Sequence, residues 1–197
     1  DRVHDLGNID AGAGPAQRVA AARPADAAHE TVAPQLREEL LEVGERDFLA
    51  GGDIGKAHRA AAFVQREIAY QPIPFGVRSR VPQAPEKTLS DRFGDSKDIA
   101  FLLSQMLACV EINTRIALVN TTEPVQTKLT TLDQFDHMVV MLPQGEGGRV
   151  IDATDKEADA RLPVPLRLAS RDAFVLDDQR PRLVRLNRPS LDAYRAT

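Results

Sequence analysis

The segment over residues 88–98, Thr-Leu-Ser-Asp-Arg-Phe-Gly-Asp-Ser-Lys-Asp, constrains the fold more than any other part of the chain. After it, hydrophobic residues recur every three or four positions, which is the pattern of a helix with one apolar face. Asp95 is a favourable N-cap for such a helix, and Asp98 can complete a capping box three residues later. The segment therefore predicts a helix that begins near Ser96 and forms the buried spine of the domain. The predicted apolar face comprises Ile99, Leu102, Leu103, Met106, Leu107 and Val110.

Helices are predicted before this segment and strands after it. Helical periodicity marks residues 34–43 and 53–70, the second capped by Asp53. The β-branched and apolar runs that predict strands cover residues 115–121, 135–142, 149–154, 174–176 and 183–186. Helices followed by an antiparallel meander are typical of an α+β domain, with N-terminal helices packed on an antiparallel β-sheet.

Length and composition fit one such domain. The chain has 197 residues, of which 43% are hydrophobic and 27% charged, as in ordinary globular proteins. Residues 1–30 are rich in alanine and lack a lasting apolar period, so we expect a flexible leader or linker there and the domain over residues 31–190. The absence of an initiator methionine and of a signal peptide indicates a trimmed or mature fragment.

Several function classes are disfavoured. The net charge of −4 gives no electrostatic basis for binding nucleic acid or anionic lipid. No apolar stretch approaches the roughly 20 residues that cross a bilayer, so no membrane insertion is expected. The histidines are scattered and the single cysteine, Cys109, lies in an apolar run, so we expect neither a metal nor another cofactor. The oligomeric state is left open.

Three residues suggest a catalytic triad. Ser96 lies at a predicted helix N-terminus, and His137 and Asp152 lie on successive predicted strands joined by a short loop. Nucleophile, base and orienting acid occur in this order, and the two strand residues can be cross-strand neighbours if the register matches. Each residue alone has an ordinary explanation: a helix-capping serine, a strand histidine and an aspartate that starts a turn.

Residues 53–155 resemble the core of the bacterial transglutaminase-like superfamily, which has a papain-like cysteine peptidase core. The matching motifs are Ile68-Ala-Tyr70 at a helix end, the Gly-Asp pair before the central helix, Phe135-Asp-His137 and Asp152-Ala-Thr154. The superfamily pattern has Gly-Asp-Cys-Lys-Asp where this chain has serine at position 96. The resemblance implies a papain-like transglutaminase core with Ser96, His137 and Asp152 in the triad positions. It also implies acyl transfer on amides or peptides and, because many relatives are exported, a bacterial extracytoplasmic (periplasmic) location.

The serine at position 96 leaves three interpretations open. A hydroxyl is scarcely ionised near neutral pH, so it cannot form the stable thiolate–imidazolium pair of a cysteine site. The chain is therefore either an inactive relative that binds a peptide or protein partner in its cleft, or a variant with serine in place of a native cysteine. The third interpretation is an active amide or peptide hydrolase or acyltransferase that uses Ser96.

The segment over residues 71–87 contains four prolines and precedes the central helix. The prolines argue against regular structure, so we expect a long ordered loop that forms one wall of a groove leading to Ser96. Tyr70 and Gln83 are the expected substrate-binding residues beside this groove. The alternative is that the segment merely crosses the surface.

Overall fold

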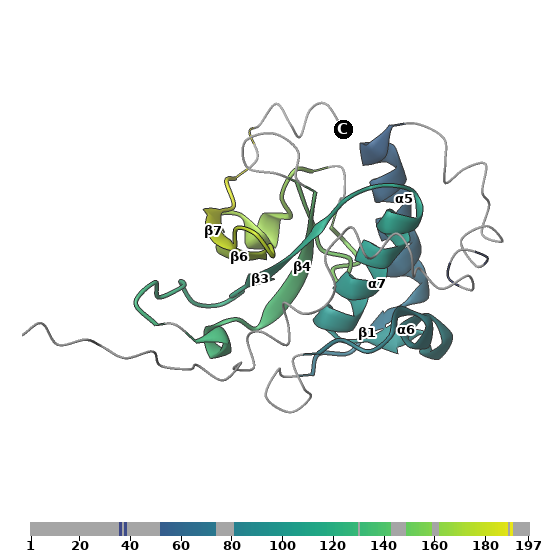
Figure 1. Ribbon diagram of the computed structural model, residues 1–197, viewed down its shortest axis with the longest axis horizontal. Coiled ribbons are helices and arrows are strands. Elements are labelled where there is room, and N and C mark those ends of the chain that lie inside the picture. Colours follow the sequence, from purple (N-terminus) through teal and green to yellow (C-terminus); the bar gives the residue numbers. More distant parts are fainter. Residues whose placement is uncertain are drawn as a thin grey trace, which may run out of the picture.

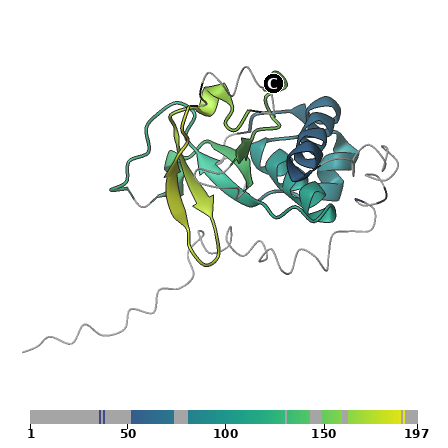
Figure 2. The same cartoon turned by 90° about the horizontal axis from the view of Figure 1, so that it is seen from above.

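The computed structural model describes residues 36, 38, 52–73, 81–129, 131–142, 149–158, 162–188 and 190. Its helices gather on one side of an antiparallel sheet that curls around them (Figures 1 and 2), so the fold is α+β as predicted. The described helices are α5 (Asp53–Glu67), α6 (Pro85–Asp91) and α7 (Ser96–Cys109), with the 3-10 turns η1 (Leu132–Gln134) and η2 (Leu166–Leu168). The strands are β1 (Ala69–Tyr70), β2 (Phe93–Gly94), β3 (Arg115–Val119), β4 (His137–Leu142), β5 (Arg149–Ile151), β6 (Asp172–Leu176) and β7 (Arg182–Arg185).

The main sheet has the strand order β5-β4-β3-β6-β7, and all of its described neighbours are antiparallel. Strands β3, β4 and β5 follow one another as the expected meander. Strand β6, however, returns to the far side of β3 and then forms a hairpin with β7 at the opposite edge (Figure 2). The α+β class is as predicted, but the sequence did not predict which strand pairs with β6, because that partner depends on long-range packing.

The sheet is covered on both faces. Strand β4 alternates between two apolar clusters: Met138, Val140 and Leu142 join the cluster under the helices, and Val139 and Met141 join the one on the opposite face. Because successive strand residues point to opposite faces, a strand buried on both sides is apolar throughout. Strand β4 is thus buried along its whole length, and helix α7 packs against it.

Helix α7 begins where the sequence predicts. Asp95 is its N-cap, and Asp95 and Asp98 exchange the two hydrogen bonds of a capping box. Its predicted apolar face is buried apart from Val110, which is half-buried at the helix end. Helix α5 differs slightly, since Gly52 is the N-cap and Asp53 is the first helical residue. Asp53 therefore favours the helix through its charge at the N-terminus and not as a cap.

Two short segments were predicted incorrectly. Tyr70 does not end helix α5 but lies in β1, which pairs in parallel with β2 and sets Tyr70 opposite Gly94. Pro85 does not prevent a helix, because it is the first residue of α6, where a missing backbone N–H costs nothing. Residues 1–30, the 143–148 loop and most of the first predicted helix lie outside the described residues. Of that helix only Leu36 and Glu38 are described, and both are helical.

Gly94 is placed where a side chain does not fit. A Cβ atom on Gly94 would lie 2.8 Å from Cβ of Asp98 and 3.3 Å from Cγ2 of Thr88. Real Cβ contacts are longer, so β2 can approach the first turn of α7 only with glycine at this position. The Gly-Asp pair of the motif is thereby explained: glycine allows the approach and aspartate caps the helix.

We predict that Gly94→Ala lowers the free energy of unfolding by about 1–3 kcal/mol, the usual cost of overpacking a buried site. Urea denaturation followed by circular dichroism measures the change. Gly52→Ala is the matched control, since nothing lies within 4 Å of a Cβ there. The loss of unfolding free energy in Gly52→Ala should be smaller, because it reflects only the preference for glycine over alanine at an N-cap. Equal losses for the two variants would contradict the steric explanation.

Candidate active site

The N-terminus of helix α7 is held by its own acidic residues. Asp95 Oδ1 accepts hydrogen bonds from the backbone N–H groups of Lys97 (3.1 Å) and Asp98 (3.2 Å). Asp98 Oδ2 in turn accepts one from the backbone N–H of Asp95 (3.2 Å). Ser96, the first helical residue and only 4% exposed, lies between these anchors. Its backbone position is therefore fixed by the capping box.

A buried ion pair lies next to Ser96. The Nζ of Lys97 donates to Oδ2 of Asp95, and both side chains are 1% exposed. A buried ammonium is costly unless it is paired, so Asp95 supports Lys97 as well as capping the helix. The backbone N–H of Gln83 also donates to Asp98 Oδ1 (2.9 Å), which attaches the chain before α6 to the first turn of α7.

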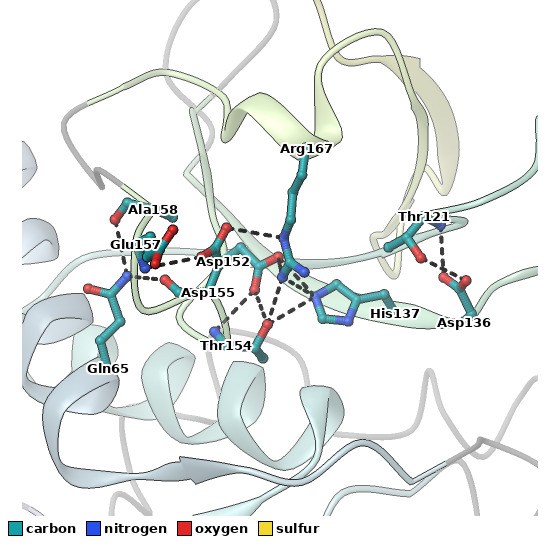
Figure 3. A network of polar contacts seen from close by, with 10 residues as sticks. All are labelled: Gln65, Thr121, Asp136, His137, Asp152, Thr154, Asp155, Glu157, Ala158 and Arg167. Atoms are coloured by element: carbon teal, nitrogen blue, oxygen red, sulfur yellow. Dashed lines mark hydrogen bonds and ion pairs between the residues drawn. The ribbon is translucent and has the colours of Figure 1, made fainter.

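His137 and Asp152 form the second half of the site. His137 begins β4, and its Nε2 lies 2.9 Å from Oδ2 of Asp152 (Figure 3). Asp152 lies immediately after β5, which ends earlier than predicted because the Asp152 side chain starts a turn. Its Oδ1 accepts the backbone N–H (3.1 Å) and the hydroxyl (2.7 Å) of Thr154. Both His137 and Asp152 are buried.

Arg167 is the site residue that the sequence did not suggest. From turn η2, its Nη2 donates to Asp152 Oδ2 and to Thr154 Oγ1 (2.7 Å), and it lies 3.2 Å from Nε2 of His137 (Figure 3). Its Nε lies 3.5 Å from Oδ2 of Asp155. The flanking Val164-Pro-Leu-Arg167 sequence carries no motif, so only the tertiary fold reveals this contact.

Neighbouring contacts hold the two strand ends in place. Gln65 of α5 donates from Nε2 to the backbone oxygens of Asp155 (2.7 Å) and Ala158 (3.2 Å). On the other side, Asp136 accepts the backbone N–H (2.9 Å) and the hydroxyl (2.8 Å) of Thr121. The turn after Asp152 and the residue before His137 are thereby fixed independently of the His–Asp contact (Figure 3).

The Asp152 carboxyl is ionised despite its burial. Burial raises its pKa, but the hydrogen bond and charge of His137, the charge of Arg167 and the hydrogen bond from Thr154 outweigh this and lower the pKa to about 2. An ionised carboxylate has no proton to donate. Consequently the hydrogen on the His137–Asp152 contact belongs to Nε2 of His137, and a neutral His137 has its lone pair on Nδ1.

Tyr70 connects the two halves. Its backbone pairs with Gly94, just before Asp95, and its ring meets the His137 ring edge-on with centroids 6.3 Å apart. Burial raises the pKa of Tyr70; the charge of Arg167 opposes this, while those of Asp152 and Asp95 add to it. Tyr70 therefore links the strand that precedes the N-terminus of α7 with the His137–Asp152 pair.

The structure brings some of the predicted site residues together but not all of them. The structure brings His137, Asp152 and Tyr70 together and attaches Gln83 to helix α7 through its backbone. Among the described residues, no hydrogen bond joins the Ser96 side chain to His137. The groove stays a prediction, because residues 74–80 of its proposed wall lie outside the described part. The catalytic and substrate-binding roles of these residues also stay predictions.

Among the described residues, no group of three or more histidine, cysteine, aspartate or glutamate side chains could hold a metal ion. Within that part of the chain, no helix is long and apolar enough to span a bilayer.

Comparison with known proteins identifies the fold. No family model matches the sequence, and no curated protein matches it. A candidate protease from Parabacteroides distasonis has a TM-score of 0.60 and 14% identity over 88% of this chain, which spans only 31% of that protein. Legionella pneumophila LapG in its calcium-bound form has a TM-score of 0.48 and 16% identity, covering 92% of this chain and 94% of its own. The first likeness, with the α+β arrangement above, establishes the papain-like transglutaminase core as the fold.

The buried pair beside Ser96 yields a stability prediction. Asp95→Ala leaves the Lys97 ammonium buried without its carboxylate and should cost about 3–5 kcal/mol of unfolding free energy. Lys97→Met should cost less, because Asp95 keeps its two backbone donors. Urea denaturation at neutral pH measures both.

The control for these variants is Lys87→Met, which breaks an ion pair between an exposed lysine and Asp91. Its cost should stay below about 1 kcal/mol. A similarly small loss for Asp95→Ala would show that the Asp95–Lys97 pair contributes little to the helix end.

Proposed function

We propose that this protein is a transglutaminase-like domain that binds a peptide or protein partner in its cleft. In this proposal Ser96 occupies the nucleophile position, His137 the base position and Asp152 the position of the orienting acid. Acyl transfer is largely lost because serine replaces the cysteine of the superfamily pattern. Tyr70 and Gln83 are the proposed substrate-binding residues.

The observation that carries the proposal is the complete His137–Asp152 pair. Its carboxylate is buried, ionised and hydrogen-bonded to Nε2, which leaves Nδ1 as the basic nitrogen. Among the described residues, nothing forms a hydrogen bond to Nδ1. Tyr70 contacts this histidine and pairs with the residue that precedes Asp95. A base so oriented is the group that activates a thiol at a helix N-terminus, the position that Ser96 occupies in α7.

The exchange of sulfur for oxygen explains why turnover should be low. A thiol at a helix N-terminus and beside an imidazole becomes a thiolate, whereas a hydroxyl must lose its proton during the attack itself. Because a C–O bond is shorter than a C–S bond, the serine oxygen lies farther from the substrate than a cysteine sulfur would. A displacement of about 1 Å can cost roughly 10²-fold in rate.

A second candidate function is acyl transfer or hydrolysis through Ser96 itself. The specific observation in its favour is the basic Nδ1 of His137, since a serine nucleophile needs a neutral imidazole as its base. If position 96 is cysteine in the natural protein, the same geometry supports a cysteine peptidase or transglutaminase.

The fold and the resemblance support the proposed partner and compartment. The likeness to a candidate protease supports a protein or peptide as the partner, although this chain spans only 31% of that protein. The superfamily resemblance supports a bacterial extracytoplasmic location. Both belong to the proposal.

We predict that Ser96→Cys creates a reactive thiol. The variant is made in a Cys109→Ala background, so that position 96 carries the only cysteine. Its alkylation by iodoacetamide at pH 6.5 should be at least about tenfold faster than that of the urea-unfolded chain, because the helix N-terminus and His137 favour the thiolate. Mass spectrometry of timed samples measures the rate.

His137→Ala in the same background is the control and should remove most of the acceleration. Equal rates for the folded and unfolded chains would contradict the proposed site. The chain with Ser96 should neither cleave fluorescently labelled casein nor react with a fluorophosphonate. Stoichiometric fluorophosphonate labelling at Ser96 would establish the second candidate function instead.

A further inference from the structure

We propose that Arg167 sets the charge of the His137–Asp152 pair: its guanidinium shares the Asp152 carboxylate with His137 and opposes the uptake of a second proton by the imidazole. This inference rests on the proposed function of the His137 site and adds a residue to it. Arg167 does not touch the reacting atoms, so it is a positioning residue.

Counting hydrogens establishes how Arg167 is bound. A guanidinium NH₂ group has two hydrogens, and those of Arg167 Nη2 have oxygen acceptors in Asp152 Oδ2 and Thr154 Oγ1. No hydrogen remains for Nε2 of His137, 3.2 Å away. The guanidinium of Arg167 therefore places a positive charge beside the His137 ring but donates no hydrogen bond to it.

The remaining hydrogens around Asp152 can be assigned in the same way. The Thr154 hydroxyl gives its single hydrogen to Asp152 Oδ1 and accepts from Arg167. Asp152 Oδ2 then accepts from both His137 Nε2 and Arg167 Nη2. One carboxylate is thus shared between a histidine and a permanent cation, so the pair is close to neutral before His137 gains a proton.

Arg167 is the cation that opposes protonation of His137, because the other charged or titratable groups nearby are neutral or bound to partners of their own. Tyr70 on β1 contacts the ring and is neutral at physiological pH. Asp136, which precedes His137, is bound to Thr121. At the start of α7, Lys97 is paired with Asp95, and Asp98 accepts from the backbones of Asp95 and Gln83. Asp155, after β5, is bound to Arg167 itself.

The test follows the ring nitrogens of His137 by ¹⁵N NMR as a function of pH, in the full chain with Ser96. Arg167→Gln and Arg167→Met both remove the charge, and the partly exposed position of Arg167 should let both variants fold. In either variant, protonation of His137 should occur about one pH unit higher than in the unsubstituted chain, the lower end of the effect of a nearby charge. Arg167→Lys, which keeps the charge, should restore most of the original behaviour.

Arg185→Gln is the matched control, because Arg185 is an exposed arginine that pairs with Asp172 at the sheet edge. It should leave the His137 titration unchanged. An unchanged titration in Arg167→Gln or Arg167→Met would overturn the proposal, as would a shift of the same size in Arg167→Lys. The readout needs no nucleophile, so its failure is distinct from a failure of the Ser96→Cys experiment.

Discussion

The buried carboxylate of Asp152 is the interaction on which the candidate site depends. It accepts from His137 Nε2, Arg167 Nη2 and both the backbone and hydroxyl of Thr154. Desolvation raises the pKa of such a group, and an acid with a proton could not fix the tautomer of His137. The hydrogen-bond donors around Asp152 lower its pKa and so favour the ionised carboxylate. The orientation of His137 is therefore a consequence of how Asp152 is satisfied.

The other half of the site depends on a second satisfied acid, at the start of helix α7. Asp95 caps the helix and neutralises buried Lys97, while Gly94 lets β2 approach the same turn. Tyr70 joins the halves by pairing with Gly94 and contacting His137. Both acids thus hold their surroundings in place through hydrogen bonds that do not involve the Ser96 side chain.

Local chemistry explains which features the sequence predicts. The start of α7 is encoded by Asp95 and Asp98 within a few residues, and strands β3 and β4 by apolar β-branched runs. The α+β fold followed from these elements and from the superfamily resemblance. Strands β1 and β2 have two residues each, so no periodicity can reveal them. The pairing of β6 with β3 and the contact of Arg167 with His137, 30 residues apart, depend on tertiary packing. Sequence patterns therefore indicate His137 and Asp152 but not the cation that acts on both.

Direct titration of the Asp152 carboxyl tests the central claim. The ¹³C shift of its side-chain carbonyl, followed by NMR from pH 1.5 to about 6, should change with a midpoint of about 2. His137→Ala, which removes the largest favourable contribution, should move that midpoint upward. A midpoint in the unsubstituted chain at or above 3.8, the ordinary value for aspartate, would contradict the account. It would mean that Asp152 is not held as a carboxylate and does not orient His137.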